Sequence, residues 1–115
     1  SNVEEEKKVE DKVFDVVEQY PSFSGGEGAM FSYISNNLRY PQKAAENGVQ
    51  GRVSVKFIVE KDGSISNVEV NRSVDPDLDN EAMRVIKNMP KWNPAKQNGT
   101  EVRAYYYVPV AFRLK

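Results

Sequence analysis

The aspartates Asp75, Asp77 and Asp79 come closest to a metal-binding motif in this sequence. Carboxylates at alternate positions open a calcium-binding loop, but such a loop also needs a glutamate at its twelfth position, where this chain has Ile86. No glycine stands at the sixth position either. Aspartates around Pro76 are instead typical of a turn and a helix start, with Asp77 the predicted N-cap. We therefore predict no metal site.

Residues suited to catalysis are scarce elsewhere. The chain has no histidine and no cysteine, which removes the commonest general base, the thiol nucleophile and the commonest zinc ligands. The glycine-rich segment 25–28 contains no lysine and follows no buried strand, so it does not resemble a phosphate-binding loop. Ser54 and Ser73 have no partner base. The sequence predicts a protein that is not an enzyme and that needs no cofactor.

The C-terminal segment 102–114 carries the strongest functional pattern. Apolar residues occupy every second position, which predicts one long strand with a buried face; they are Val102, Ala104, Tyr106, Val108, Val110, Phe112 and Leu114. Pro109 cannot donate a ladder hydrogen bond, so we expect this strand at a sheet edge. Exposed edges accept another extended chain. The predicted peptide-binding residues are the alternate set: Arg103, Tyr105, Tyr107, Pro109, Ala111 and Arg113.

The outward face of this strand has two interpretations. Tyr105 and Tyr107 should share it with Arg103, Arg113, Arg52 and Lys56. Aromatic and basic residues on an open sheet resemble an RNA-stacking platform, but they also pack against each other across strands. The pI of about 5.5 favours packing, and we predict no nucleic-acid partner. Trp92 could likewise anchor a partner or cap the core, and capping is the preferred interpretation.

The remaining pattern predicts an α+β fold. Met30, Ile34 and Leu38 recur at helical spacing, and Tyr40-Pro41 then starts a short helix that Asn47-Gly48 closes. Strands over 53–59 and 65–70 flank an Asp-Gly turn, and a helix over 78–89 precedes the last strand. We expect a three-stranded antiparallel sheet with two or three helices on one face. The predicted core is Val53, Val55, Phe57, Val59, Val68, Val70, Leu78, Ala82, Val85, Ile86, Val108, Val110 and Phe112.

The N-terminal segment differs in composition from the rest. It is acidic and lacks sustained periodicity, so residues 1–20 are predicted to be the end of a linker and residues 21–115 the domain. Residues 13–17 are partly apolar and form either a short strand or a segment lying against the body. No run of 18 or more apolar residues occurs, so we expect any membrane anchor to lie upstream of this chain.

An ordered set of motifs resembles the C-terminal domain of TonB-family energy transducers. The set covers the chain from about residue 20 to its end; it comprises Leu38-Arg-Tyr-Pro41, Gly48-Val-Gln-Gly-Arg-Val53, Lys61-Asp-Gly-Ser-Ile65, Asp79-Asn-Glu-Ala82, Met89-Pro-Lys-Trp-Asn-Pro94 and Val108-Pro-Val-Ala-Phe112. The lead-in Phe23-Ser-Gly-Gly-Glu27 resembles the Bacteroidetes branch, although Ser24 stands where that branch often has proline.

The resemblance implies a periplasmic domain that is tethered to the inner membrane and driven, through upstream regions, by an ExbB–ExbD motor. Such a domain grips the TonB box of outer-membrane transporters by strand addition to its last strand. The resemblance also implies that Tyr40, Pro41, Gln42 and Gln50 flank the docking groove. The alternatives are the same domain on another membrane protein, such as a sensor-type metallopeptidase, and a homodimerisation module that pairs through 102–114.

Overall fold

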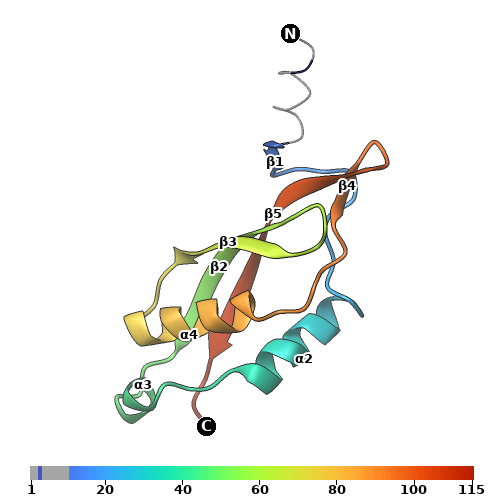
Figure 1. The fold of residues 1–115 in the computed structure, drawn as a ribbon. Coiled ribbons are helices and arrows are strands. Elements are labelled where there is room, and N and C mark those ends of the chain that lie inside the picture. Colours follow the sequence, from blue (N-terminus) through green and yellow to red (C-terminus); the bar gives the residue numbers. More distant parts are fainter. Residues whose placement is uncertain (1–2, 4–10) are drawn as a thin grey trace.

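The computed structural model describes residue 3 and residues 11–115. Eight elements follow in chain order (Figure 1): β1 (Val13–Phe14), α2 (Glu27–Asn37), α3 (Gln42–Glu46), β2 (Gly51–Val59), β3 (Ile65–Arg72), α4 (Pro76–Lys87), β4 (Ala95–Gln97) and β5 (Thr100–Phe112). The α+β class predicted from the sequence is confirmed. None of the described helices is long and apolar enough to span a bilayer.

The sheet is larger than the sequence predicted. Its three long strands pair antiparallel in the order β5-β2-β3, as expected. Two short strands are added to β5, however, because β1 pairs with it in parallel and β4 pairs with it antiparallel. The predicted three-stranded antiparallel sheet is therefore present, and β1 and β4 extend it into a mixed sheet of five strands. Strands of two and three residues are too short to show the alternation on which a strand prediction depends.

The N-terminal segment contacts the body through β1. Val13 pairs with Arg103 and Phe14 pairs with Ala104, and Val17 is buried in a small cluster beside Phe14. That cluster also contains Ala95, Val102 and Ala104. Both interpretations left open for residues 13–17 apply, since the segment forms a short strand and then packs on the body. The predicted linker boundary at residue 20 therefore falls inside a segment that touches the domain.

Local sequence signals explain the helix ends. Asp75, not the predicted Asp77, is the N-cap of α4, because its carboxylate accepts hydrogen bonds from the N–H groups of Asp77 and Leu78. Pro76 then fits the first helical position, where no N–H is needed. The predicted end of α3 is confirmed: Asn47 is its C-cap, and Gly48 follows with a φ of 68°.

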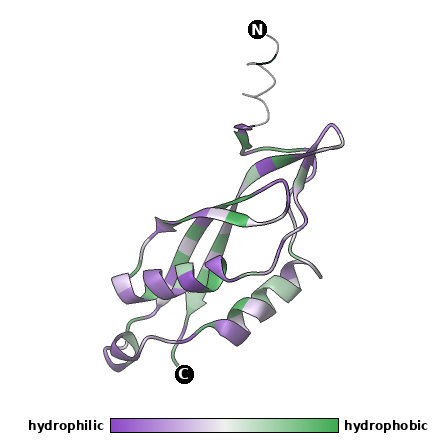
Figure 2. Cartoon of the chain, in the orientation of Figure 1, coloured by the Kyte–Doolittle hydropathy of each residue, from purple (hydrophilic) through white to green (hydrophobic). Residues whose placement is uncertain are grey.

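The core lies between the sheet and the helices α2 and α4. The inward residues of β2 and β5 pack against the apolar side of α4, while the polar side of that helix faces outward (Figure 2). Val68 and Val70, predicted as core residues, are only half-buried, because β3 is the outer strand of the sheet. The sequence-based core omitted several buried residues: Val17, Phe23, Met30, Ile34, Ala44, Ile58, Trp92, Ala95, Val102 and Ala104.

Trp92 caps the core, which confirms the interpretation preferred from the sequence. It is buried and its ring meets those of Phe23, Phe57 and Tyr106, with centroids 4.9 to 5.6 Å away. Its backbone N–H donates to the carbonyl of Gly63 in the β2–β3 turn at 2.8 Å. Gly63 has a φ of 86°, and a Cβ there would lie 2.0 Å from the Trp92 carbonyl oxygen. The turn thus needs glycine both for its backbone conformation and for this close approach.

Candidate functional site

The C-terminal part of β5 has one free edge. It pairs with β2 from Ala104 to Phe112. Among the described residues, β1 covers only Arg103 and Ala104 of β5, and β4 covers only residues 100–102. Residues 105–112 therefore have a strand neighbour on one side alone. The sheet order places β1 on the side of β5 opposite β2, so the free edge continues the line that β1 begins (Figure 1).

The free edge carries the backbone groups of the odd-numbered residues. The N–H of Leu114 faces β2, since it donates to Oε1 of Gln50, just before that strand, at 2.7 Å. Hydrogen-bonding groups alternate sides along an antiparallel strand, so the groups of Phe112, Val110 and Val108 also face β2. Those of Tyr107, Pro109, Ala111 and Arg113 face outward. Pro109 thus has its missing N–H on the free side, where no ladder bond in the domain is lost.

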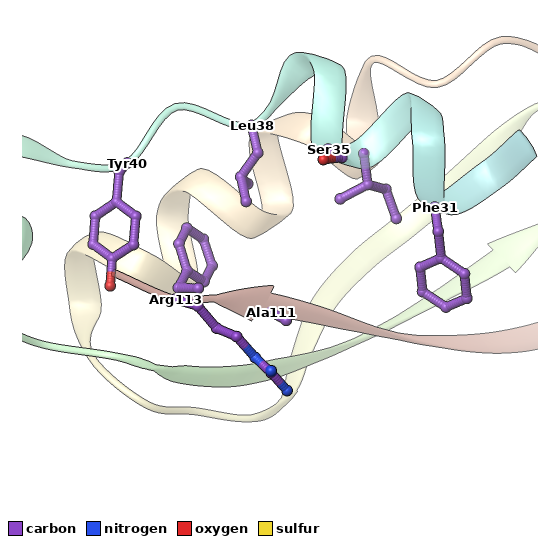
Figure 3. A pocket seen from close by; sticks show the side chains of 8 residues that line it. Phe31, Ser35, Leu38, Tyr40, Ala111 and Arg113 are labelled. Atoms are coloured by element: carbon purple, nitrogen blue, oxygen red, sulfur yellow. The ribbon is translucent and has the colours of Figure 1, made fainter. Parts of the chain in front are cut away.

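A hollow of about 370 Å³ lies between this edge and helix α2. Figure 3 shows side chains descending from α2 toward β5, and Arg113 extending from the strand on the side away from the helix. The lining is mostly apolar and comes from α2, the segment after it and the end of β5: Phe31, Ile34, Ser35, Leu38, Tyr40, Ala111, Phe112 and Arg113. A side chain of a strand added to β5 would find an apolar surface here.

A second hollow lies on the β2 side of the same strand end. It is lined by Gln50, Gly51 and Arg52 together with the residues that it shares with the first hollow, which are Ala111, Phe112 and Arg113. The first hollow is lined by one arginine, Arg113, and the second by two, Arg52 and Arg113; neither lining contains a carboxylate side chain.

Two of the four residues predicted to flank the groove, Tyr40 and Gln50, line a hollow. Tyr40 lines the first hollow, where its ring meets Phe112 edge-on at 5.6 Å and its hydroxyl donates to the Val49 carbonyl. Gln50 lines the second hollow and holds the end of β5. Pro41 is the N-cap of α3 and lines neither hollow.

Gln42 is placed differently from Tyr40 and Gln50. Its Nε2 donates to Oε1 of Glu46 one turn along α3 at 2.9 Å, and its side chain lines neither hollow. The short helix thus presents Gln42 at the surface, outside the linings of the two hollows.

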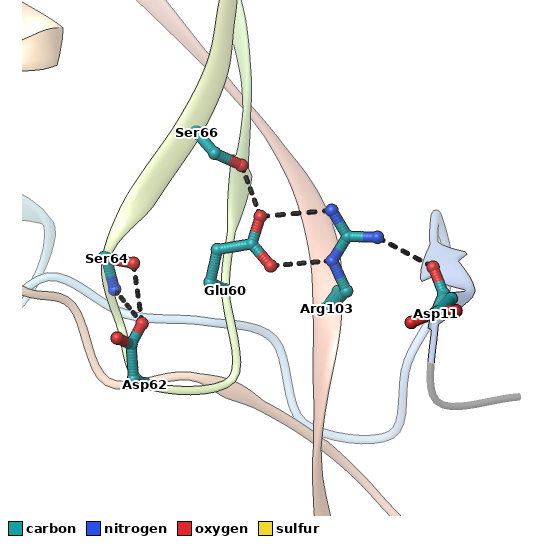
Figure 4. A network of polar contacts seen from close by, with 6 residues as sticks. All are labelled: Asp11, Glu60, Asp62, Ser64, Ser66 and Arg103. Carbon is teal, nitrogen blue, oxygen red and sulfur yellow. Dashed lines mark hydrogen bonds and ion pairs between the residues drawn. The ribbon is translucent and has the colours of Figure 1, made fainter. Parts of the chain in front are cut away.

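Arg103 stands apart from the other predicted edge residues. Its guanidinium bonds both oxygens of Glu60, at 2.6 and 3.1 Å, and donates to the backbone carbonyl of Asp11 at 2.7 Å (Figure 4). Ser66 also donates to Glu60. The hydrogen bonds from Arg103 hold the pKa of the Glu60 carboxyl below its ordinary value. The backbone and the side chain of Arg103 are therefore engaged within the chain.

Tyr105 and Tyr107 lie on the outer face of the sheet. The Lys56 ammonium sits 4.2 Å from the Tyr105 ring centroid and 5.8 Å from that of Tyr107, and it reaches Glu69 at 3.9 Å. This arrangement is the cross-strand packing that the sequence favoured over an RNA platform. Tyr107 keeps 46% of its surface exposed beside the free edge.

Sequence reasoning missed the contribution of α2 to the site. Ile34 and Leu38 were assigned to the packed stripe of this helix, yet both also line the hollow with Phe31 and Ser35. Phe31 is 39% exposed, which is unusual for so large an apolar side chain. The sequence did contain a signal for this role of α2, namely the width of its apolar stripe. Phe31 makes that stripe wider than a single core-facing side of the helix requires.

The aspartates 75, 77 and 79 serve the start of α4. Asp79 accepts a hydrogen bond from the Ser73 hydroxyl and another from the Val74 N–H, while Asp75 caps the helix. Across residue 3 and residues 11–115, no group of three or more potential metal-ligating side chains is arranged around a common point. Asp75 and Asp79 thus accept local hydrogen bonds at the start of α4, and Asp77 lies in its first turn.

The sequence of this chain is similar to those of known proteins. The family described as the Gram-negative bacterial TonB protein C-terminal matches residues 36–114. The chain is 31% identical over 83 residues to a Protein TonB of Helicobacter pylori and 35% identical over 91 residues to one of Xanthomonas campestris pv. campestris. These matches cover 71% and 76% of this chain but only 28% and 40% of those proteins.

A solved structure agrees with the sequence comparisons. The NMR structure of the Helicobacter pylori TonB C-terminal domain superposes with a TM-score of 0.59 at 28% identity, covering 76% of this chain and 92% of that one. The chain belongs to the TonB C-terminal domain family, which is not a family of enzymes. The relatives named here come from Helicobacter and Xanthomonas, and they give no support to the predicted Bacteroidetes branch.

Proposed function

We propose that this domain grips an extended peptide of a partner protein by adding it as a strand beside residues 105–113 of β5. The observation that carries the proposal is the single-sided pairing of β5 along this stretch. An unpaired strand edge offers a row of backbone donors and acceptors that a second extended chain completes. The hollow beside α2 then receives side chains from one face of the added strand.

The family suggests the partner and the cellular role. We propose that the peptide is the TonB box of an outer-membrane transporter and that the domain works in the periplasm. In that role the inner-membrane segment and the contact with ExbB and ExbD belong to upstream regions outside this chain. A sensor-type metallopeptidase that carries the same domain is the alternative parent. The lead-in over residues 23–27 supports the Bacteroidetes-type branch as a proposal.

Pro109 shapes the ladder that this edge forms. The outward carbonyls of Tyr107, Pro109 and Ala111 all accept hydrogen bonds, but only Tyr107 and Ala111 of the three donate one. A partner strand therefore meets a gap in the row of donors at the centre of the site. Registers that place a peptide carbonyl opposite the Pro109 nitrogen lose a bond, which restricts how the peptide aligns.

Amide chemical-shift mapping with a TonB-box peptide tests the proposal. We expect the shifts to cluster on residues 105–113 and on α2, and to be small on β3, which forms the opposite edge of the sheet. A peptide with proline at a ladder-donating position is the control, and it should not bind because the donor is missing. Shifts that cluster on residues 60–70 and spare β5 would overturn the proposal.

The flanking glutamines need a separate test. We propose that Gln50 supports the site by holding the end of β5 through the Leu114 N–H, and that Gln42 touches the peptide from α3. Gln50→Ala should weaken peptide binding and broaden the amide signals of residues 112–114. Gln42→Ala should weaken binding without that broadening. If neither substitution changes the affinity, both residues lie outside the site.

Homodimerisation through the same edge is the second candidate function. The free edge favours it as well, because two copies of β5 could complete each other's ladder. Sedimentation at several concentrations distinguishes the two. A dimer that dissociates when the TonB-box peptide is added would show that both processes use this edge.

A further inference from the structure

The segment that links α2 to α3 supplies two side chains to the first hollow. Leu38 and Tyr40 line this hollow, and both point toward the end of β5 (Figure 3). Tyr40 is held at its tip, because its hydroxyl donates to the Val49 carbonyl and its ring meets Phe112 edge-on. The shape of the hollow therefore depends also on what fixes the backbone of residues 37–40.

Helix α4 holds this backbone at two points. Oε2 of Glu81 accepts the Arg39 backbone N–H at 2.6 Å, and Nη2 of Arg84 donates to the Asn37 carbonyl oxygen at 2.9 Å. The two side chains are also joined to each other, since Nε and Nη2 of Arg84 donate to Oε1 and Oε2 of Glu81 at 2.7 and 2.8 Å. We call this arrangement of Glu81 and Arg84 the α4 clasp.

The clasp satisfies backbone groups that helix α2 leaves open at its end. The helix ends at Asn37, whose carbonyl oxygen is among the last, which have no partner within a helix. Arg84 binds that oxygen, and its positive charge is favoured at a helix C-terminus. The Arg39 N–H lies beyond the helix, and Glu81 accepts its hydrogen bond. The path of the chain after α2 is therefore fixed by α4.

The clasp is more than an ion pair within one helix. Glu81 and Arg84 are three residues apart on α4, and exposed pairs of this kind contribute little by themselves. Here the Glu81 side chain is only 10% exposed, and it accepts an N–H from a residue 42 positions away in sequence. Burial acts to raise the pKa of the Glu81 carboxyl, but the hydrogen bonds from Arg84 and Arg39 outweigh it and leave that pKa below its ordinary value. Glu81 is therefore ionised at neutral pH, and its charge strengthens both hydrogen bonds.

We propose that Glu81 and Arg84 are positioning residues for peptide binding, because they hold residues 37–40 so that Leu38 and Tyr40 form one wall of the hollow before a strand arrives. This inference rests on the proposed function, since it assumes strand addition beside residues 105–113. Without the clasp, the segment would be ordered only when the peptide binds, and the cost of that ordering would lower the affinity.

Isosteric substitution of the clasp tests the proposal. Glu81→Gln keeps the size of the side chain and removes its charge, and Arg84→Gln removes the guanidinium. We expect each variant to bind the TonB-box peptide used for shift mapping about two- to tenfold more weakly, which corresponds to ordering one additional side chain on binding. Arg84 is 41% exposed, so Arg84→Gln should fold even if Glu81→Gln does not. Melting temperatures show which variants are folded.

Glu60→Gln is the matched control. Glu60 also binds an arginine through both carboxylate oxygens, but it lines neither hollow. This control variant should lose stability and keep its affinity for the peptide. A loss of affinity in Glu60→Gln as large as that in Glu81→Gln would show that the peptide responds to stability in general, which would overturn the positioning role.

A double-mutant cycle provides a measurement that a purely structural role would not change. If the clasp acts through Leu38, Glu81→Gln should weaken binding by a smaller factor once Leu38→Ala has removed the side chain that the clasp positions. The same factor in both backgrounds would mean that the clasp does not act through Leu38, and it would overturn the proposal.

The outcomes for the clasp and for strand addition differ. Unchanged affinity in Glu81→Gln and Arg84→Gln, with amide shifts still on residues 105–113, would overturn the positioning role and leave strand addition standing. Shifts away from β5 in the unmodified domain would overturn strand addition itself, and the positioning role with it.

Discussion

At the scale of single residues, Phe112 links the core to the candidate site. It is fully buried, its ring packs edge-on against Tyr40, and it lines both hollows at the end of β5. Stability and the shape of the docking edge therefore depend on the same side chain. Most other residues of the edge do not serve both stability and edge shape, because the odd-numbered residues from Tyr107 onward are exposed on the outer face.

We predict that Phe112→Ala lowers the free energy of unfolding by about 3–5 kcal/mol, the usual cost of emptying a buried aromatic site. Urea unfolding measures the change. Phe57→Ala should cost a similar amount, because Phe57 is equally buried and touches Trp92 and Tyr106. Ala111→Ser, on the exposed side of the same strand, should change stability by less than about 0.5 kcal/mol. A melting temperature that barely moves in Phe112→Ala would show that the strand faces are assigned wrongly.

Gly63 provides a second residue-scale prediction with an internal control. Gly63→Ala should destabilise the domain by more than Gly99→Ala does. Both glycines have positive φ, 86° and 75°, but the added Cβ meets the Trp92 carbonyl at 2.0 Å in the first case and nothing within 4 Å in the second. Gly99→Ala should cost about 1–2 kcal/mol from backbone conformation alone. Equal costs in thermal unfolding would show that the turn moves away from Trp92 freely.

At the scale of elements, the pairing of β1 with β5 depends on a charged cluster. Arg103 joins Glu60 at the end of β2 to the carbonyl of Asp11, just before β1. The native pKa of Glu60 is lowered from its ordinary value of 4.5 by these hydrogen bonds. The stability that the pair contributes is therefore fully present above about pH 4.5, and it is lost as the pH falls through the lower native value.

We predict that Glu60→Gln destabilises the domain at about pH 7, and that its difference from the unmodified chain shrinks toward about pH 3. Glu81 also has a lowered pKa, but it is present in both proteins and cancels in the difference. Urea unfolding at the two pH values measures the effect. Glu69→Gln is the control, since its contact with Lys56 is long and exposed and should contribute little. A difference that is constant with pH would mean that the Glu60 carboxylate does not stabilise the native state.

The long elements could be predicted from the sequence, whereas the shortest strands could not. Alternation in 53–59 and 102–114, helical spacing in 78–86 and the proline at 109 predicted the long strands, the main helix and a free edge on β5, because each of these signals is local. The additions β1 and β4 depend on pairing between segments about ninety and five residues apart in sequence, and they are too short for a periodic signal.

The hollow beside the edge could not be predicted for a related reason. It exists because α2 is placed next to the end of β5, and no pattern within Glu27–Asn37 states where that helix lies. Arg103 illustrates the same limit at one position. Its spacing assigns it to the edge with Tyr105 and Tyr107, but Glu60 and Asp11 approach it from other parts of the chain. Local periodicity gives the face of a residue, and tertiary contacts decide its partner.

At the scale of the whole molecule, the formal net charge of −1 implies weak long-range electrostatics. We predict micromolar affinity for a TonB-box peptide, because ordering a short flexible chain offsets much of its contact energy. Affinity should change by less than about tenfold between low and high salt, since strand addition works mainly through uncharged backbone hydrogen bonds. Isothermal titration at two ionic strengths measures both quantities. A steep loss of affinity with salt would instead indicate binding through many charges, as nucleic acids bind.

The parallel pairing of β1 with β5 has a mechanical consequence. In the proposed role, the chain ahead of Val13 leads to the motor and the peptide sits further along the same strand. Tension between the two would pass along β5 alone and load both pairings in shear, so that several hydrogen bonds share the force. The helices and the core would not lie in its path. A domain of this design could pull on a partner while remaining folded.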